Sequence, residues 1–206
     1  SQIALRSLKN LSLAMLLRGV DEKNILLAVN QFDNANNMTD QLSALSALVN
    51  CSLPSAENII SEKLESFYAQ WSHESLVVNK WLSLQAMSER PNALSKVKAL
   101  KNHEAYNDTN PNKIRALVGV FCNQNISQFH SANGEGYLFL AKEVIRLDSF
   151  NSQLASRIMT PLTKWQRFSG QNREAMYNAL MLISGNENIS PDVYEIVSKS
   201  LIVENE

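Results

Sequence analysis

Apolar residues recur at three- and four-residue spacing from one end of the chain to the other, and this periodicity constrains the fold most. Such spacing places side chains on one face of an α-helix. Only 6 glycines and 5 prolines interrupt the 206 residues, which is few for the tight turns of a β protein. No segment shows the strict alternation of a half-buried strand. The sequence therefore predicts an all-α chain of about eleven helices, each roughly 10 to 16 residues long.

Helices of the first half illustrate the pattern. The first ends near Gly19, and one of its faces carries Leu5, Leu8, Leu11, Met15 and Leu16. Thr39 is a good N-cap for a later helix. The stripe expected to be buried on that helix is Leu42, Leu45, Leu48 and Val49.

The second half follows the same pattern. Asn110 and Pro111 provide an N-cap followed by proline at the first helical position. A loop with Gly134 and Gly136 leads into the next helix, and Pro161 kinks or splits a later one. The apolar stripe expected after the glycine loop is Tyr137, Leu140, Ala141, Val144 and Ile145.

The length and order of these helices favour an irregular α-solenoid, a HEAT- or armadillo-like superhelix. Two helices with their turns take about 35 to 40 residues, the period of those repeats. The pairs share no consensus, so the repetition is structural only. A closed bundle is the alternative, but eleven helices would need a larger core than bundles usually have.

Charge and cysteine content narrow the possible partners and location. The 19 basic and 20 acidic residues give a net charge of −1, so we expect neither a nucleic-acid partner nor a membrane partner. Cys51 and Cys122 lie in apolar runs, which predicts two buried free thiols in a reducing compartment. The start does not resemble a signal peptide, and no apolar run is long enough to span a membrane. We therefore expect a cytoplasmic protein.

The histidines do not form a zinc motif. His73 and His103 are each followed by glutamate, as in His-Glu-x-x-His, but the second histidine is replaced by Val77 and Asn107. His130 stands alone beside the glycine loop. Nucleophile elbows and phosphate-binding loops are also absent from the sequence. We expect no catalytic residue and no metal site in these 206 residues.

Two arginines are candidate binding residues. Arg115 lies in a run that is apolar on every face, so its guanidinium must be paired or must point into a solvent-filled concavity. Gln153 and Arg157 are four residues apart and share one helical face, where they offer a fork of donors to a carboxylate or a peptide carbonyl. The alternative is an exposed polar face plus one structural ion pair.

Several long segments resemble a known family. Examples are Asn-Pro-Asn-Lys-Ile-Arg at residues 110–115 and Gln-Leu-Ala-Ser-Arg-Ile-Met at 153–159, with further similarity over 37–50, 77–86 and 136–140. Together they resemble the C-terminal helical domain of bacterial M1-family zinc aminopeptidases over close to the whole chain.

The resemblance implies a role beyond what the spacing indicates. Residues 1–206 would be part of one C-terminal α-superhelical domain that walls the substrate chamber of the parent enzyme and contacts its catalytic domain. Gln153, Arg157 and Arg115 would face that chamber and bind peptide substrates without taking part in catalysis. Zinc would belong to the catalytic domain of the parent chain, where N-terminal residues are hydrolysed from peptides.

The motifs that carry the family's chemistry are missing here. Neither the zinc motif nor the Gly-x-Met-Glu-Asn motif that binds the substrate amine occurs in the sequence. We therefore expect the chain by itself to be inactive. The competing hypothesis is a stand-alone α-solenoid scaffold that binds protein partners on its concave face.

Overall fold

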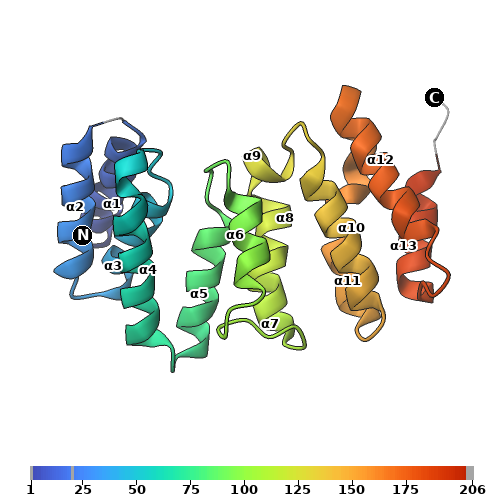
Figure 1. Ribbon diagram of the computed structural model, residues 1–206, viewed down its shortest axis with the longest axis horizontal. Coiled ribbons are helices and arrows are strands. Elements are labelled where there is room, and N and C mark those ends of the chain that lie inside the picture. Colours follow the sequence, from blue (N-terminus) through green and yellow to red (C-terminus); the bar gives the residue numbers. More distant parts are fainter. Residues whose placement is uncertain (1, 20, 203–206) are drawn as a thin grey trace. The chain divides into compact units, whose positions relative to one another are not determined.

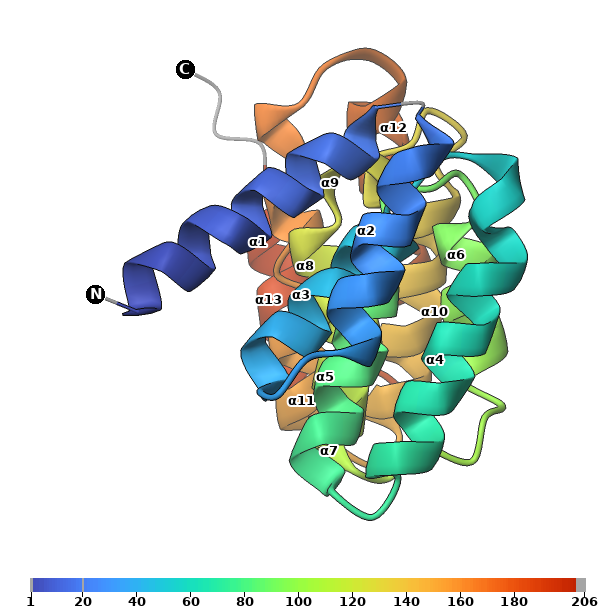
Figure 2. The same cartoon turned by 90° about the vertical axis from the view of Figure 1, so that its left-hand side faces the viewer.

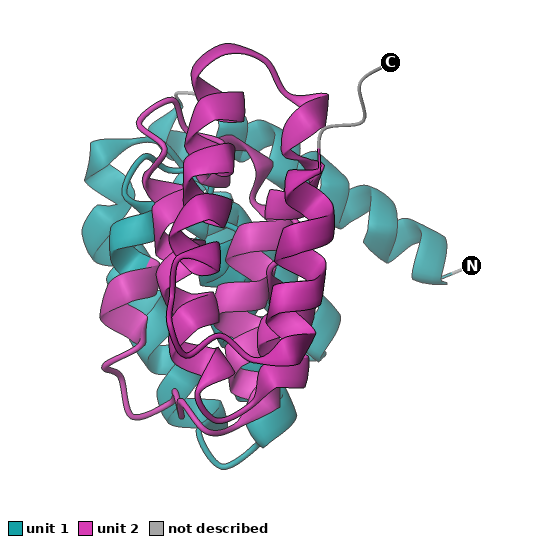
Figure 3. Cartoon of the chain, turned by 90° about the vertical axis from the view of Figure 1, so that its right-hand side faces the viewer, with its two compact units in different colours: residues 1–96 teal, residues 97–206 magenta. Residues whose placement is uncertain are grey.

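A computed structural model describes residues 2–19 and 21–202, and every regular element in them is helical (Figure 1). The described residues form two compact units, 1–96 and 97–206 (Figure 3). The first unit contains α1 (Gln2–Arg18), α2 (Glu22–Asp33), α3 (Met38–Val49), η1 (Pro54–Ala56), α4 (Glu57–Trp71) and α5 (Ser75–Ala86). α6 (Ala93–Leu100) contains the boundary between the units.

The second unit has shorter and more varied helical segments. α7 (Pro111–Ile114), the π-helical η2 (Arg115–Gly119) and α8 (Val120–Gln124) follow one another without a break. The rest of the unit consists of α9 (Ile126–Phe129), α10 (Glu135–Asp148), α11 (Ser152–Ile158), η3 (Leu162–Arg167), α12 (Gly170–Ser184) and α13 (Pro191–Leu201). The helices follow one another along the chain as predicted, but they are divided into more segments than the eleven expected.

Helices pack mainly on their close neighbours in the sequence. In the first unit α3 contacts α1, α2, α4 and α5, and in the second unit α10 contacts α9, α11 and α12. A closed bundle would also bring together helices far apart in the sequence. The observed pattern within each unit is that of an all-α solenoid, in which each helix covers the next.

α3 confirms most of its predicted buried stripe. Leu45 and Leu48 are fully buried and Val49 nearly so, whereas Leu42 is half-buried. The helix begins two residues earlier than predicted, because its N-cap is Asn37 and not Thr39. The Asn37 side chain accepts a hydrogen bond from the backbone N–H of Asp40, and this satisfies one of the free donors of the first turn.

α1 is a helix as predicted, but its larger apolar face is not the one that is buried. The residues expected to share its apolar face, from Leu5 to Leu16, are exposed, and Leu13 and Leu17 are the buried ones. Leu13 and Leu17 lie one turn apart on the side that packs against α2 and α3. Periodicity thus predicts the helix correctly but not the face that is covered.

A glycine loop sets the start of α10. Gly134 has φ of 68°, a left-handed conformation that favours glycine, and it directly precedes the helix. A Cβ at Gly136 would lie 2.4 Å from the carbonyl oxygen of Phe129, so only glycine allows this close approach. The predicted stripe behind this loop is confirmed: Tyr137, Leu140, Ala141 and Val144 are fully buried, with Ile145 at its edge.

A buried carboxylate joins α1, α2 and α3. Asp40 accepts hydrogen bonds from Lys9 Nζ at 2.5 Å and from Asn10 Nδ2 at 3.0 Å. Gln31 of α2 donates to the Asp40 carbonyl oxygen at 3.0 Å and to Asn10 Oδ1 at 2.8 Å. The bond from Lys9 is the main reason that the pKa of Asp40 lies below its ordinary value of 3.8.

Replacing this carboxylate is expected to destabilise the first unit. Asp40→Asn removes the ion pair with Lys9 and replaces one of the two acceptor oxygens by an NH2 group, so Lys9 and Asn10 no longer each have a carboxylate oxygen. This costs about 1 to 3 kcal/mol in the free energy of unfolding. Because the folded-state pKa is lowered, the contribution is complete above the unfolded-state pKa and is lost as the pH falls through the folded-state pKa. Denaturant unfolding at neutral pH and at pH 3 measures both effects.

The control is Glu89→Gln, which removes an exposed ion pair with Arg18 in the same unit. It should change stability little at either pH. Equal losses in the two variants would contradict the structural role assigned to Asp40.

Candidate functional site

The candidate site predicted from sequence lies on α11. Asn151 caps this helix by accepting a hydrogen bond from the backbone N–H of Leu154 at 3.0 Å. Leu154, Ala155 and Ile158 are buried, and the helix packs against α10 and α13. The opposite face is therefore turned outward.

Gln153 and Arg157 are both exposed on that outward face. Their four-residue spacing places them one turn apart, as the sequence predicts. Within residues 2–19 and 21–202 neither side chain makes a hydrogen bond or an ion pair. The guanidinium and the amide therefore have their donors available to an acceptor such as a carboxylate or a peptide carbonyl.

Arg115 is also exposed, at the first residue of the π-helical segment η2. Its Nη1 donates to Asn112 Oδ1 at 3.3 Å, and no carboxylate in the described residues pairs with it. The prediction that its helix is buried on every face is wrong. Ile114, Ala116, Leu117 and Val118 are buried, but Arg115 occupies an open side.

The structure does not join the two parts of the predicted site directly. Gln153 and Arg157 share α11, whereas Arg115 belongs to η2. No hydrogen bond connects these two elements through the three side chains in the described part of the chain. The three residues thus offer two separate sets of donors in the second unit.

The three histidines have local roles. His103 Nδ1 accepts from the backbone N–H of Ala105 at 3.0 Å, and His130 Nδ1 lies 2.8 Å from the hydroxyl of Tyr137. His73 stacks on Trp71 with ring centroids 6.4 Å apart. Over residues 2–19 and 21–202, no three His, Cys, Asp or Glu side chains gather into a group suited to a metal ion. Cys51 and Cys122 are buried and free, as predicted.

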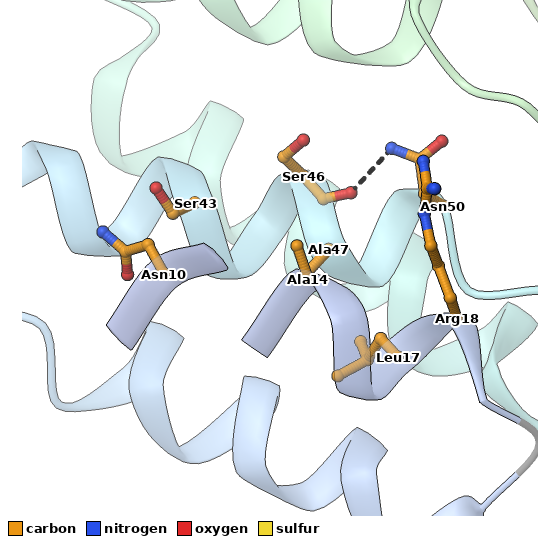
Figure 4. A pocket seen from close by; sticks show the side chains of 8 residues that line it. All are labelled: Asn10, Ala14, Leu17, Arg18, Ser43, Ser46, Ala47 and Asn50. Carbon is orange, nitrogen blue, oxygen red and sulfur yellow. Dashed lines mark hydrogen bonds between the residues drawn. The ribbon is translucent and has the colours of Figure 1, made fainter. Parts of the chain in front are cut away.

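A cavity of about 290 Å³ between α1 and α3 is a second candidate (Figure 4). Two of its polar side chains already have partners: Asn50 Nδ2 donates to the Ser46 carbonyl oxygen at 3.0 Å, and Arg18 pairs with Glu89 at 3.0 Å. The lining consists of Asn10, Ala14, Leu17 and Arg18 from α1 and Ser43, Ser46, Ala47 and Asn50 from α3. This lining holds no pair of groups for acid–base or nucleophilic chemistry.

Sequence reasoning missed a buried charge cluster around Glu143 in the second unit. Glu143 accepts a hydrogen bond from Lys101 and another from Arg146 Nη2 at 2.8 Å. Arg146 Nη2 also lies 3.3 Å from Asp108 Oδ1. Glu143 and Arg146 are three residues apart on one helix, so their spacing indicates this pair in the sequence. Lys101 lies 42 residues away in the sequence, so no local pattern indicates it.

The chain belongs to the family described as "Domain of unknown function (DUF3458_C) ARM repeats", whose model matches residues 1–202. ARM repeats are helical solenoid repeats. The family therefore agrees with the solenoid packing of both units.

Similar proteins are aminopeptidases, and the chain aligns with their C-terminal region. It is 40% identical to aminopeptidase N of Escherichia coli K12 over 199 residues and 39% identical to that of Haemophilus influenzae over 199 residues. Each match covers 97% of this chain and 22% of the relative, so the chain spans about a fifth of their length.

A solved structure is similar over the same extent. The crystal structure of Legionella pneumophila aminopeptidase A in complex with aspartic acid matches with a TM-score of 0.88 at 34% identity. The match covers 97% of this chain and 23% of that chain. None of the helices in the described residues is long and apolar enough to cross a membrane.

We expect that removing the carboxylate of the Glu143 cluster strongly destabilises the fold. Glu143→Gln leaves the half-buried cations of Lys101 and Arg146 without their shared carboxylate, which costs about 2 to 4 kcal/mol in the free energy of unfolding. Denaturant unfolding of the 206-residue chain measures this loss.

The matched control is Glu195→Gln, which removes an exposed pair with Lys199 on α13. It should be nearly neutral. A Glu143→Gln variant as stable as this control would show that the cluster contributes nothing to the fold.

Proposed function

We propose that residues 1–206 form the C-terminal helical domain of a zinc-dependent aminopeptidase of the M1 family. The family match and the aminopeptidase relatives support this proposal. In the parent enzyme the domain walls the substrate chamber and helps to bind peptides, while the catalytic domain removes the N-terminal residue.

The observation that carries the binding role is the outward face of α11. Arg157 and Gln153 are exposed there, one turn apart, and no partner in the described residues engages their donors. A guanidinium binds a carboxylate or carbonyl with charge-assisted hydrogen bonds, and a neighbouring amide adds a further donor. We propose that these two residues bind the peptide beyond the scissile bond, and that Arg115 contributes a second cation.

These residues act on the substrate by holding it. A bound downstream segment restricts how the peptide lies and so favours one orientation of its N-terminal end. Neither an arginine nor a glutamine on an exposed helix face can serve as a general base, so we assign no catalytic residue to this chain.

Zinc does not fit the described residues, because they contain no ligand group suited to it. We therefore assign the metal to the catalytic domain of the parent chain and expect no cofactor in residues 1–206. We also propose a cytoplasmic location, and the two buried free thiols support a reducing compartment.

Arg157→Ala in the full-length enzyme tests the binding role. We expect kcat/KM for peptides to fall, because a charge-assisted hydrogen bond to the substrate is removed. The fall should correspond to a loss of about 1 to 3 kcal/mol in transition-state stabilisation. Single-residue chromogenic substrates lack the downstream part and should lose less. Steady-state kinetics of Arg157→Ala and of Gln153→Ala on both substrate types measure the effect.

Arg167→Ala is the matched control, since Arg167 is an exposed arginine on the neighbouring η3. It should leave both substrates unaffected. Equal losses for peptides and single-residue substrates in Arg157→Ala would rule out a specific contact with the downstream peptide. The 206-residue chain with added zinc should show no peptidase activity.

A further inference from the structure

A hollow on the second unit is bordered by two aromatic rings and by two charges of opposite sign. It has a volume of about 400 Å³ and lies between η3 and the first half of α12. α12, orange in Figures 1 and 2, packs against η3, α10 and α13. The lining residues are Trp165 from η3 and Gly170, Arg173, Glu174 and Tyr177 from α12. The volume is within the range of pockets that hold small molecules.

The two aromatic rings form the apolar part of this α12 hollow. Trp165 is only 4% exposed, and its indole N–H donates to the carbonyl oxygen of Ser200 at 2.8 Å, so its ring is fixed. The ring of Tyr177 is half-buried, and its centroid lies 5.1 Å from that of Trp165. The pair gives a well-held apolar surface against which the side chain of a ligand can pack.

The cation of the hollow is Arg173. Its guanidinium carbon lies 5.2 Å from the centroid of the Trp165 ring, a cation–π contact that restricts the side chain. Among the described residues, no carboxylate or other hydrogen-bond acceptor engages the guanidinium. Its N–H donors are therefore held in place and available, which is the arrangement that binds a carboxylate.

The anion of the hollow is Glu174, which also has no hydrogen bond or ion pair with residues 2–19 and 21–202. Consecutive residues on a helix do not face each other, so Arg173 and Glu174 do not neutralise each other. Tyr177 lies one turn further along the helix from both charges. At Gly170 the rim is open, because a Cβ there would meet no atom within 4 Å.

An available cation and an available anion beside an apolar surface fit a zwitterion with an apolar side chain. A ligand with a carboxylate alone would be repelled by Glu174, and a ligand with an ammonium group alone would be repelled by Arg173. An α-amino acid carries both charges on one carbon atom and can satisfy both residues. Its side chain is then left to contact Tyr177.

We propose that the α12 hollow binds a free α-amino acid with an aromatic or apolar side chain. Arg173 binds the carboxylate, Glu174 binds the ammonium group, and the side chain packs on Tyr177. This inference goes beyond the proposed function and does not depend on Arg157 or Gln153. If the chain belongs to an aminopeptidase, the ligand is of the same chemical class as the residue that hydrolysis releases.

Nuclear magnetic resonance of the 206-residue chain tests the proposal, with the indole N–H of Trp165 as the reporter. The other two tryptophans, Trp71 and Trp81, belong to the first unit and serve as internal references. The probe is L-phenylalanine. Two matched ligands are L-phenylalaninamide, which lacks the carboxylate, and N-acetyl-L-phenylalanine, which lacks the ammonium group.

L-Phenylalanine should shift the Trp165 signal alone and saturably, with a dissociation constant of about 1 mM for a ligand of this size. Each blocked derivative should bind at least about 10-fold more weakly, because one charge-assisted contact is lost. Arg173→Gln and Glu174→Gln should weaken the binding of L-phenylalanine by a similar factor. The control Arg167→Gln changes an exposed arginine of η3 that does not line the hollow, and it should bind as before.

Three results would overturn the proposal. Absence of a saturable shift of Trp165 up to the solubility limit of phenylalanine would mean that the hollow takes no amino acid. Equal binding of the blocked derivatives would mean that only the aromatic ring is recognised. Equal weakening by the Arg167→Gln control would mean that the two lining charges have no specific role.

Two further variants keep these outcomes interpretable. Glu174→Gln leaves the contact between Arg173 and Trp165 in place, so it tests the site even where Arg173→Gln disturbs the packing of η3. Far-UV circular dichroism and Tm of each variant show whether it is folded. Arg157→Ala should not change the binding of L-phenylalanine to the 206-residue chain, so failure of the peptide-binding role is distinguishable from failure of this inference.

Discussion

The burial of each helix against its sequence neighbours is the interaction on which the rest of the structure depends. In the first unit α3 supplies the centre, with Ala44, Leu45 and Leu48 fully buried among the surrounding helices. Full burial of a leucine contributes roughly 1.5 to 3 kcal/mol relative to exposure. α10 has the same position in the second unit, where Tyr137, Leu140 and Val144 are fully buried. Polar groups then fix the geometry locally, as Asp40 does between α1 and α3.

This local packing explains how a short helix can present an exposed polar face. α11 is held on one side by three apolar residues and at its start by the Asn151 cap. Its other side is not needed for the core, so Gln153 and Arg157 are exposed there.

Much of this organisation is predictable from sequence, because caps and periodicity are local. The cap at Asn110, the glycine loop at Gly134 and the stripe of α10 follow from a few neighbouring residues. The shared face of Gln153 and Arg157 is predicted by spacing alone. Their binding role is an inference from the resemblance to the aminopeptidase family, since spacing shows a common face but not a ligand.

The failures have physical causes. α1 has apolar residues on two sides, and periodicity does not show which side its neighbours cover. Arg115 is the one charged residue of an apolar run, and composition alone does not show that its side of the helix is open. The Glu143 cluster depends on Lys101 from a distant segment, which only the tertiary fold brings near.

The central claim is that Arg157 and Gln153 bind the part of a peptide beyond the scissile bond. The most direct measurement is a crystal structure of the full-length enzyme with a non-hydrolysable peptide. The account predicts nitrogen atoms of both side chains within about 3.2 Å of peptide oxygens downstream of the first bond. Side chains that pair instead with carboxylates of the catalytic domain, with the peptide elsewhere, would contradict it.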